Sequence, residues 1–300
     1  DGIALADELL SMDGLRTPQR LQLMFAQGAM FHRKGEINQA TARYNELYDL
    51  ARDVGDSIIT CRVLNQLGIA YSEQADLPRA FIHFKTALVI AQDNGHDKIE
   101  CRLLISQGTL HKEKGELNHA QSCYESALEI ARRFQYTIAH NILLGRLGTL
   151  HFALGQYDIA HSYLNQSLGQ SPTSISRIQQ GLQSGFLGNV LMAKGQLHKA
   201  EQWLLRSIEI CDEVLPLGSG GFRASLAVIR QRQGEVDEAR ALLRRAESQL
   251  RGVYEVELGK MLCKRALIEQ RAGDHTTAWD ALAEAQNIAR KLQCTGQSEL

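Results

Sequence analysis

The sequence predicts an all-α protein, a right-handed superhelical solenoid of about seven helical hairpins with a partial repeat in front. A small residue recurs in the same context every 39 or 40 residues, and an internal period of this length is the signature of a protein whose repeats pack on one another. Only four prolines occur in 300 residues, so long helices can run without interruption.

Three columns of small residues define the repeat. The first is the turn column: Gly35, Ala75, Gly115, Gly155, Gly195, Gly234 and Gly273. Five residues later comes Ala40, Ala80, Ala120, Ala160, Ala200, Ala239 or Ala278, and seven residues before it comes Gly28, Gly68, Gly108, Gly148, Gly188, Ala227 or Ala266. A turn glycine fits the left-handed residue that ends a helix. The other two columns predict close crossing of two helices, because glycine inside a helix costs roughly 1 kcal/mol relative to alanine.

A large apolar residue follows each column alanine by four positions. Its members are Tyr44, Phe84, Tyr124, Leu164, Leu204, Leu243 and Leu282, and three positions later a small or apolar residue usually follows. Spacings of four and three keep these side chains on one face of the second helix. Each hairpin therefore buries that face only when the neighbouring hairpins stack on it.

This order of small, alanine, large and small residues resembles the tetratricopeptide repeat (TPR) over residues 21–292. The usual repeat has 34 residues and ends in proline, whereas these units are longer and lack that proline. The longer form resembles the repeats of spindle-orientation adaptors, kinesin light chains, bacterial peptide-sensing regulators and maltose-regulator-like transcription activators. The last segment is also similar to the end of solenoids in large bacterial multidomain kinase–ATPase signalling proteins.

The pattern predicts a helix at 3–11 and then seven hairpins. First helices are expected near 18–34, 57–74, 97–114, 138–154, 175–194, 221–233 and 254–272, and second helices near 37–53, 77–93, 117–134, 157–170, 197–213, 236–250 and 275–292. The predicted organisation is a partial repeat at 1–17, repeats at 18–54, 55–94, 95–135, 136–172, 173–217, 218–252 and 253–292, and a tail or the start of another element at 293–300. We expect a flexible connection at 215–221 and, because the chain starts within the pattern, a segment of a longer protein.

The charge and composition of the chain argue against two classes of partner, nucleic acids and membranes. The net charge is −1, without the basic stripe of a nucleic-acid-binding protein, and no run of about 18 apolar residues predicts a membrane span. Six cysteines form no Cys-x-x-Cys pair, which favours free thiols in a reducing cytoplasm. We therefore expect a cytoplasmic segment that binds neither nucleic acid nor membrane.

No catalytic motif is apparent. The sequence has no phosphate-binding Gly-x-x-x-x-Gly-Lys loop and no Gly-x-Ser-x-Gly elbow. His111 and His151 occupy a column that holds Phe31 and Tyr71 in earlier repeats, so we interpret both histidines as packing residues. We expect no catalytic residue, cofactor or metal, and no enzyme activity in this segment, although attached domains could be enzymes.

The resemblance implies a concave groove lined by the first helices. Transferred residue by residue, it predicts partner-binding positions at Arg62, Asn65, Arg102, Ile142, Gly145, Thr149, Phe152, Leu182, Gly185, Asn189, Met192, Arg232, Lys260 and Arg271. Gly145 and Gly185 should leave a hollow with apolar walls, beside a basic end. The other interpretation is that the apolar members are core and that the basic ones form a solvated face.

We expect a non-catalytic scaffold that binds a protein or peptide segment, including one from another domain of the same protein, as the regulatory region of a signalling protein. The alternative is a sensor for a small ligand or signalling peptide that controls an attached transcription activator, ATPase or kinase. An open channel favours a peptide and a closed pocket favours a small molecule. Self-association through the chain ends is a third hypothesis.

Overall fold

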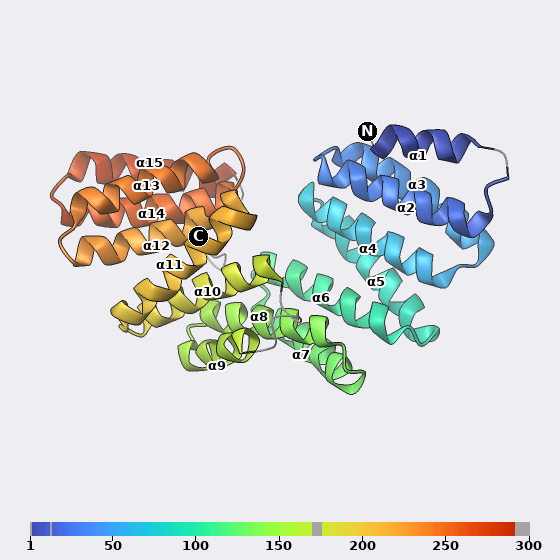
Figure 1. The fold of residues 1–300 in the computed structure, drawn as a ribbon, viewed down its shortest axis with the longest axis horizontal. Coiled ribbons are helices and arrows are strands. Elements are labelled where there is room, and N and C mark those ends of the chain that lie inside the picture. The colour runs from blue at the N-terminus through green and yellow to red at the C-terminus, as the bar shows by residue number, and fades with distance from the viewer. Residues whose placement is uncertain (1, 13, 170–175, 292–300) are drawn as a thin grey trace. The chain divides into compact units, whose positions relative to one another are not determined.

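The computed structural model describes residues 2–12, 14–169 and 176–291, and within them all regular structure is helical. Helix α1 (Gly2–Ser11) precedes seven hairpins (Figure 1). Their first helices are α2 (Thr17–Arg33), α4 (Ser57–Glu73), α6 (Asp97–Glu113), α8 (Thr137–Ala153), α10 (Arg177–Ala193), α12 (Gly220–Arg232) and α14 (Glu255–Arg271). Their second helices are α3 (Ile37–Val54), α5 (Leu77–Asp93), α7 (Leu117–Arg133), α9 (Tyr157–Leu168), α11 (Leu197–Val214), α13 (Val236–Leu250) and α15 (His275–Lys291). The predicted series of helical hairpins is confirmed.

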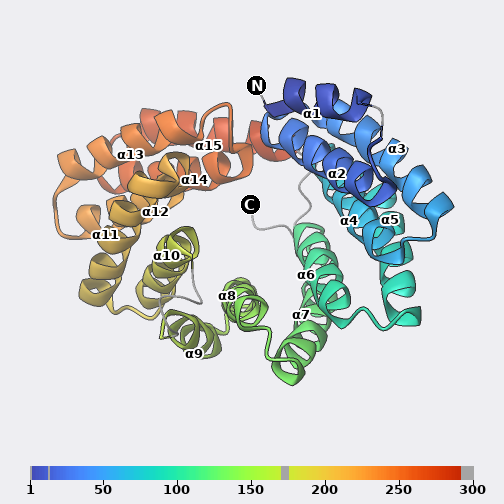
Figure 2. The ribbon, with the colours of Figure 1, turned by 45° about the vertical axis from the view of Figure 1, so that its right-hand side comes forward.

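The chain forms two compact units, Asp1–Ala139 and His140–Leu300. In the first unit α4 packs on α5 and α6 on α7, while α3 contacts α4 and α5 contacts α6. Figure 2 shows these pairs as adjacent helices. In the second unit α10 packs on α11, α12 on α13 and α14 on α15. Each hairpin therefore stacks on its neighbour within the unit.

The turn column ends every first helix in the left-handed region. All seven turn residues have a positive φ, including Ala75 at 60°, which occupies the place of a glycine. Gln135 takes the same conformation at φ 56°, in the connection that corresponds to Gly55 and Gly95. Because left-handed backbone is unfavourable for residues with a Cβ, the surrounding hairpin packing must impose it at these two positions.

The column of small residues before each turn sits against the large residue of the second helix. A Cβ added to Gly68 would lie 2.5 Å from the Phe84 ring, and one added to Gly148 would lie 2.7 Å from Leu164. The column alanines of the second helices, from Ala40 to Ala239, are fully buried. The predicted close crossing is thus confirmed, since in the first five hairpins even a Cβ would not fit between the two helices.

The connection at 215–221, where we expected a flexible segment, is largely helical. It contains a short 3-10 helix, Pro216–Ser219, that leads directly into α12. The buried Arg223 side chain anchors it by donating hydrogen bonds to Asp212, Ser219 and Gln249. These bonds with Arg223 hold the pKa of Asp212 below its usual range. The Arg223 side chain thus ties the connection to α11 and α13, and the flexibility of the connection stays a prediction.

The Gly108–Tyr124 contact provides a stability test. A Cβ on Gly108 would lie 2.6 Å from the Tyr124 ring, so Gly108→Ala should lower the free energy of unfolding by about 1–3 kcal/mol through overpacking. In a Tyr124→Ala background the ring that meets this Cβ is absent, whereas a leucine would still meet it, as Leu164 does at Gly148. Urea denaturation should therefore show that Gly108→Ala costs much less in the Tyr124→Ala background. An equal cost in both backgrounds would contradict the close-contact account.

Candidate functional site

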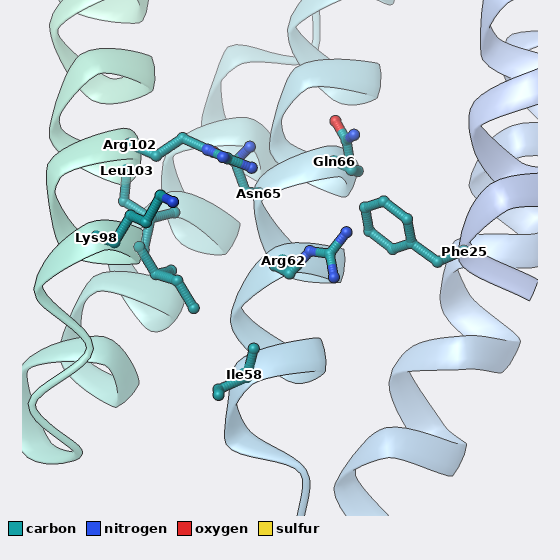
Figure 3. A pocket seen from close by; sticks show the side chains of 9 residues that line it. Phe25, Ile58, Arg62, Asn65, Gln66, Lys98, Arg102 and Leu103 are labelled. Atoms are coloured by element: carbon teal, nitrogen blue, oxygen red, sulfur yellow. The ribbon is translucent and has the colours of Figure 1, made fainter. Parts of the chain in front are cut away.

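The first unit contains a pocket of about 300 Å³ that is lined by side chains of three successive first helices. Phe25 comes from α2, and the rest come from α4 and α6 (Figure 3). The lining residues are Phe25, Ile58, Arg62, Asn65, Gln66, Lys98, Ile99, Arg102 and Leu103. The structure therefore brings together Arg62, Asn65 and Arg102, three of the residues expected at the groove.

Three cationic side chains surround this pocket. Figure 3 shows Arg62 reaching from α4 toward Phe25, and Arg102 reaching from α6 toward α4. The Arg62 guanidinium carbon lies 4.2 Å from the centre of the Phe25 ring. Within the described part of the chain, Arg62, Lys98 and Arg102 form no ion pair with a carboxylate. The pocket thus presents uncompensated positive charge over an apolar wall.

Asn65 is the polar group at the centre of the pocket. Its side chain is only 7% exposed, and its Oδ1 has no hydrogen-bond partner among the described residues. A buried polar atom without a partner costs about 1–3 kcal/mol. This Oδ1 atom is itself buried, so it is not part of the surface that the pocket offers to a ligand.

The repeat explains why these side chains meet. Arg62 and Arg102 are 40 residues apart and therefore occupy the same place in neighbouring hairpins, while Asn65 follows Arg62 by three residues on the same helical face. Ile58 and Lys98 were missed by the sequence analysis. Each lies four residues before an arginine of this pair, one helical turn earlier on the same face. This spacing alone would have been enough to predict that Ile58 and Lys98 line the same pocket.

A second pocket adjoins the first through a shared residue, Gln66. It is lined by Ala26, Ala29, Met30, His32, Arg33, Tyr44 and Gln66, and its volume is about 470 Å³. The Nε2 atom of His32 lies 2.9 Å from a carboxylate oxygen of Glu73. The surface lined by α2 and α4 therefore continues from the first pocket into the second, where α3 contributes Tyr44.

The sequence led us to expect a hollow at Gly145 and Gly185 in the second unit, and this expectation is wrong. A Cβ on Gly145 would lie 2.5 Å from Nε2 of Gln183, and one on Gly185 would lie 2.4 Å from the Phe222 ring. Both glycines are buried, and Gln183 also accepts a hydrogen bond from Ser167 at 2.9 Å. The missing side chains make room for neighbouring helices of the unit and not for a partner.

The other expected residues of this region are half-buried. Phe152, Leu182 and Met192 pack against the core of the second unit, which fits the interpretation that they are core residues. The remaining three expected positions, Ile142, Thr149 and Asn189, are also partly exposed. Their role in binding a partner therefore stays a prediction.

The basic residues expected at one end of the groove have different surroundings, and their role in binding stays a prediction. Lys260 forms an ion pair with Glu257 at 3.0 Å, whereas Arg271 donates a hydrogen bond to the side chain of Gln231 at 3.4 Å and Arg232 is exposed.

A partly buried cation of this unit, Lys264, was not predicted from the sequence. Its Nζ donates a hydrogen bond to Oγ of Ser225 at 2.8 Å, and burial lowers the pKa of Lys264 to about 8.

The hairpins and their small-residue contacts define a tetratricopeptide-type repeat protein. The chain belongs to the MalT-like TPR region family, whose model matches residues 3–180. No curated protein matches the chain. No described helix is long and apolar enough to cross a membrane.

Solved structures with similar folds include bacterial regulators. The Rap conjugation gene regulator of plasmid pLS20, in complex with the Phr* peptide, aligns over 97% of this chain and 81% of its own, with 17% identity and a TM-score of 0.70. The apo quorum sensor NprR from B. thuringiensis aligns over 95% and 80%, with 15% identity and a TM-score of 0.70. A signal transduction ATPase with numerous domains and a tetratricopeptide repeat sensor, from Pyrococcus horikoshii, aligns over 97% and 43%, with 13% identity and a TM-score of 0.68. These likenesses confirm the TPR-type fold.

Lys264 provides a pH-dependent test. Because its pKa is about 8 in the folded protein and about 10.4 when unfolded, the unfolded state binds more protons between these values, and stability should rise with pH there. Lys264→Met should raise the free energy of unfolding at pH 7 by about 1–3 kcal/mol and abolish most of that rise. The exposed Lys199→Met is the matched control. Parallel stability–pH curves for the parent and Lys264→Met would contradict the burial of this ammonium.

Proposed function

We propose that the first unit binds a peptide or protein segment that carries a carboxylate beside an apolar side chain. The observation that supports this most directly is the pocket in which Arg62, Lys98 and Arg102 lack carboxylate partners among the described residues. Arginine forms paired hydrogen bonds with a carboxylate. An aspartate, a glutamate or a terminal carboxylate of the partner would supply the missing charge.

The other walls of the pocket suit a polypeptide. Phe25, Ile58 and Ile99 offer apolar surface, and burying one large aliphatic side chain there stabilises the complex by about 1.5–3 kcal/mol. The fold is also that of a regulator solved with its Phr* peptide, which supports a peptide as the ligand class.

The alternative proposal is a sensor that passes ligand binding on to an attached effector. The similarity to the tetratricopeptide repeat sensor of a multidomain ATPase supports it. A pocket of about 300 Å³ lies at the lower end of the range for small ligands. In both proposals the segment is a non-catalytic, cytoplasmic binding module.

A peptide selection tests the proposed function. From a random heptapeptide library, the chain should enrich sequences that combine Asp or Glu with Leu, Ile or Phe. Arg62→Ala and Arg102→Ala should each weaken binding of the selected peptides by about 10- to 100-fold, because a hydrogen bond to a charged group contributes about 1.5–3 kcal/mol. Affinities are measured by fluorescence anisotropy at low and high salt, and high salt should weaken them.

Arg132→Ala is the matched control, because Arg132 is an exposed arginine on α7 outside the pocket. It should leave peptide affinity unchanged. Selection of basic peptides, or equal affinity for the parent and both pocket variants, would contradict the proposal. Binding of a free carboxylic acid as tight as that of any peptide would instead favour the small-ligand sensor.

A further inference from the structure

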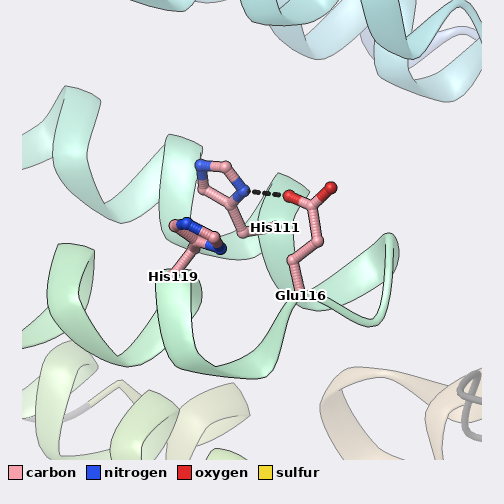
Figure 4. Close-up of side chains that lie close together, drawn as sticks. All are labelled: His111, Glu116 and His119. Carbon is pink, nitrogen blue, oxygen red and sulfur yellow. Dashed lines mark hydrogen bonds and ion pairs between the residues drawn. The ribbon is translucent and has the colours of Figure 1, made fainter.

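Three side chains with metal-binding chemistry meet at the turn between α6 and α7, apart from the peptide pocket. His111 lies in the last turn of α6, Glu116 precedes α7, and His119 lies in its first turn (Figure 4). Each offers one ligand atom, and these atoms all lie within 4.8 Å of one another. The sequence analysis considered the histidines singly and therefore expected no metal.

The hairpin itself brings these three positions together. In the second hairpin Arg79 forms an ion pair with Asp76, at the places of His119 and Glu116. In the sixth hairpin Arg230 forms ion pairs with Glu235 at 3.3 Å and Glu238 at 3.1 Å, at all three places. The meeting of His111, Glu116 and His119 is thus a consequence of the repeated turn and not of one rotamer.

We propose that His111, Glu116 and His119 bind a Zn²⁺ ion through two imidazoles and one carboxylate, with the fourth position open to an external ligand. Zinc binds histidine nitrogens and carboxylate oxygens at about 2.0–2.2 Å, and a site with three protein ligands keeps one exchangeable position. Two histidines and a glutamate from the two ends of one rigid turn satisfy this requirement.

The surrounding contacts hold His111 and Glu116 near the required geometry, and the His119 ring stacks on the His111 ring, with ring centres 5.3 Å apart. Nδ1 of His111 lies 2.5 Å from one oxygen of Glu116, and the Lys114 ammonium lies 2.8 Å from the other. Lys114 thus fixes the carboxylate while one oxygen stays directed at His111. The His111 ring also packs edge-on against Phe81, with ring centres 5.9 Å apart. Ligands around zinc are about 3.4 Å apart in a tetrahedron, so His111 and Glu116 need to separate by only about 1 Å.

The alternative is a purely structural cluster in which Glu116 serves as a hydrogen-bond acceptor for His111. In the fourth hairpin the same places hold His151, Gln156 and Ile159, and Nδ1 of His151 lies 2.5 Å from the Gln156 oxygen. In that hairpin the turn packs in the same way, although only His151 of the three residues could bind zinc. It also provides a natural template for a variant that keeps the packing and loses the metal site.

Isothermal titration of Zn²⁺ into the chelator-treated full chain, under reducing conditions and in a Cys263→Ser background, tests the proposal. We expect one Zn²⁺ per chain, a higher melting temperature with zinc because only the folded chain binds it, and Co²⁺ absorption bands typical of tetrahedral coordination. The double variant Glu116→Gln/His119→Ile, which copies the fourth hairpin, should lose the site. His111→Tyr, which copies Tyr71, should weaken zinc binding at least about tenfold.

His198→Asn is the control for unspecific histidine binding, because His198 is exposed on α11. It should bind zinc like the parent. Circular dichroism without metal should show the parent's helix content for the double variant. Zinc binding that the double variant and His111→Tyr both retain, or no binding of Zn²⁺ below millimolar concentration by the parent, would overturn the proposal.

Discussion

The contact on which the architecture depends is the close crossing of the two helices in each hairpin. In the first five hairpins a glycine of the first helix lies under an aromatic ring or a leucine of the second, with space too small for a Cβ. Because interiors are packed to crystal-like density, such a contact fixes the register of one helix on the other. The register repeats every 39 or 40 residues, so equivalent side chains of successive first helices fall side by side.

The pocket of the first unit and the turn cluster both follow from this register. Arg62 and Arg102 meet because they hold equivalent places in neighbouring hairpins. His111 and Glu116 meet because every turn folds its two helix ends together around a left-handed residue. A single packing rule therefore places two chemically different groups of side chains, one suited to carboxylates and one suited to a metal ion.

The hairpins and their turns could be predicted from the sequence, because the small residues of the turn and crossing columns are required by the backbone geometry. Even Ala75 was correctly predicted as a turn residue. The hollow at Gly145 and Gly185 could not be predicted, since what fills the space beside a glycine depends on Gln183 and Phe222 from other helices. The His111 cluster was missed because its members were examined one at a time. The helical form of the connection at 215–221 could not be predicted either, because the partners of the buried Arg223 lie on both sides of that segment.

The central claim is that the register of α2, α4 and α6 creates the binding surface of the chain. Cross-linking with a selected acidic peptide that carries a diazirine-bearing leucine, followed by mass spectrometry, tests it most directly. The account predicts that cross-links fall on the first helices of the first unit, around Phe25, Ile58–Gln66 and Lys98–Leu103. Cross-links confined to α3, α5 and α7, or to residues 140–291, would contradict it.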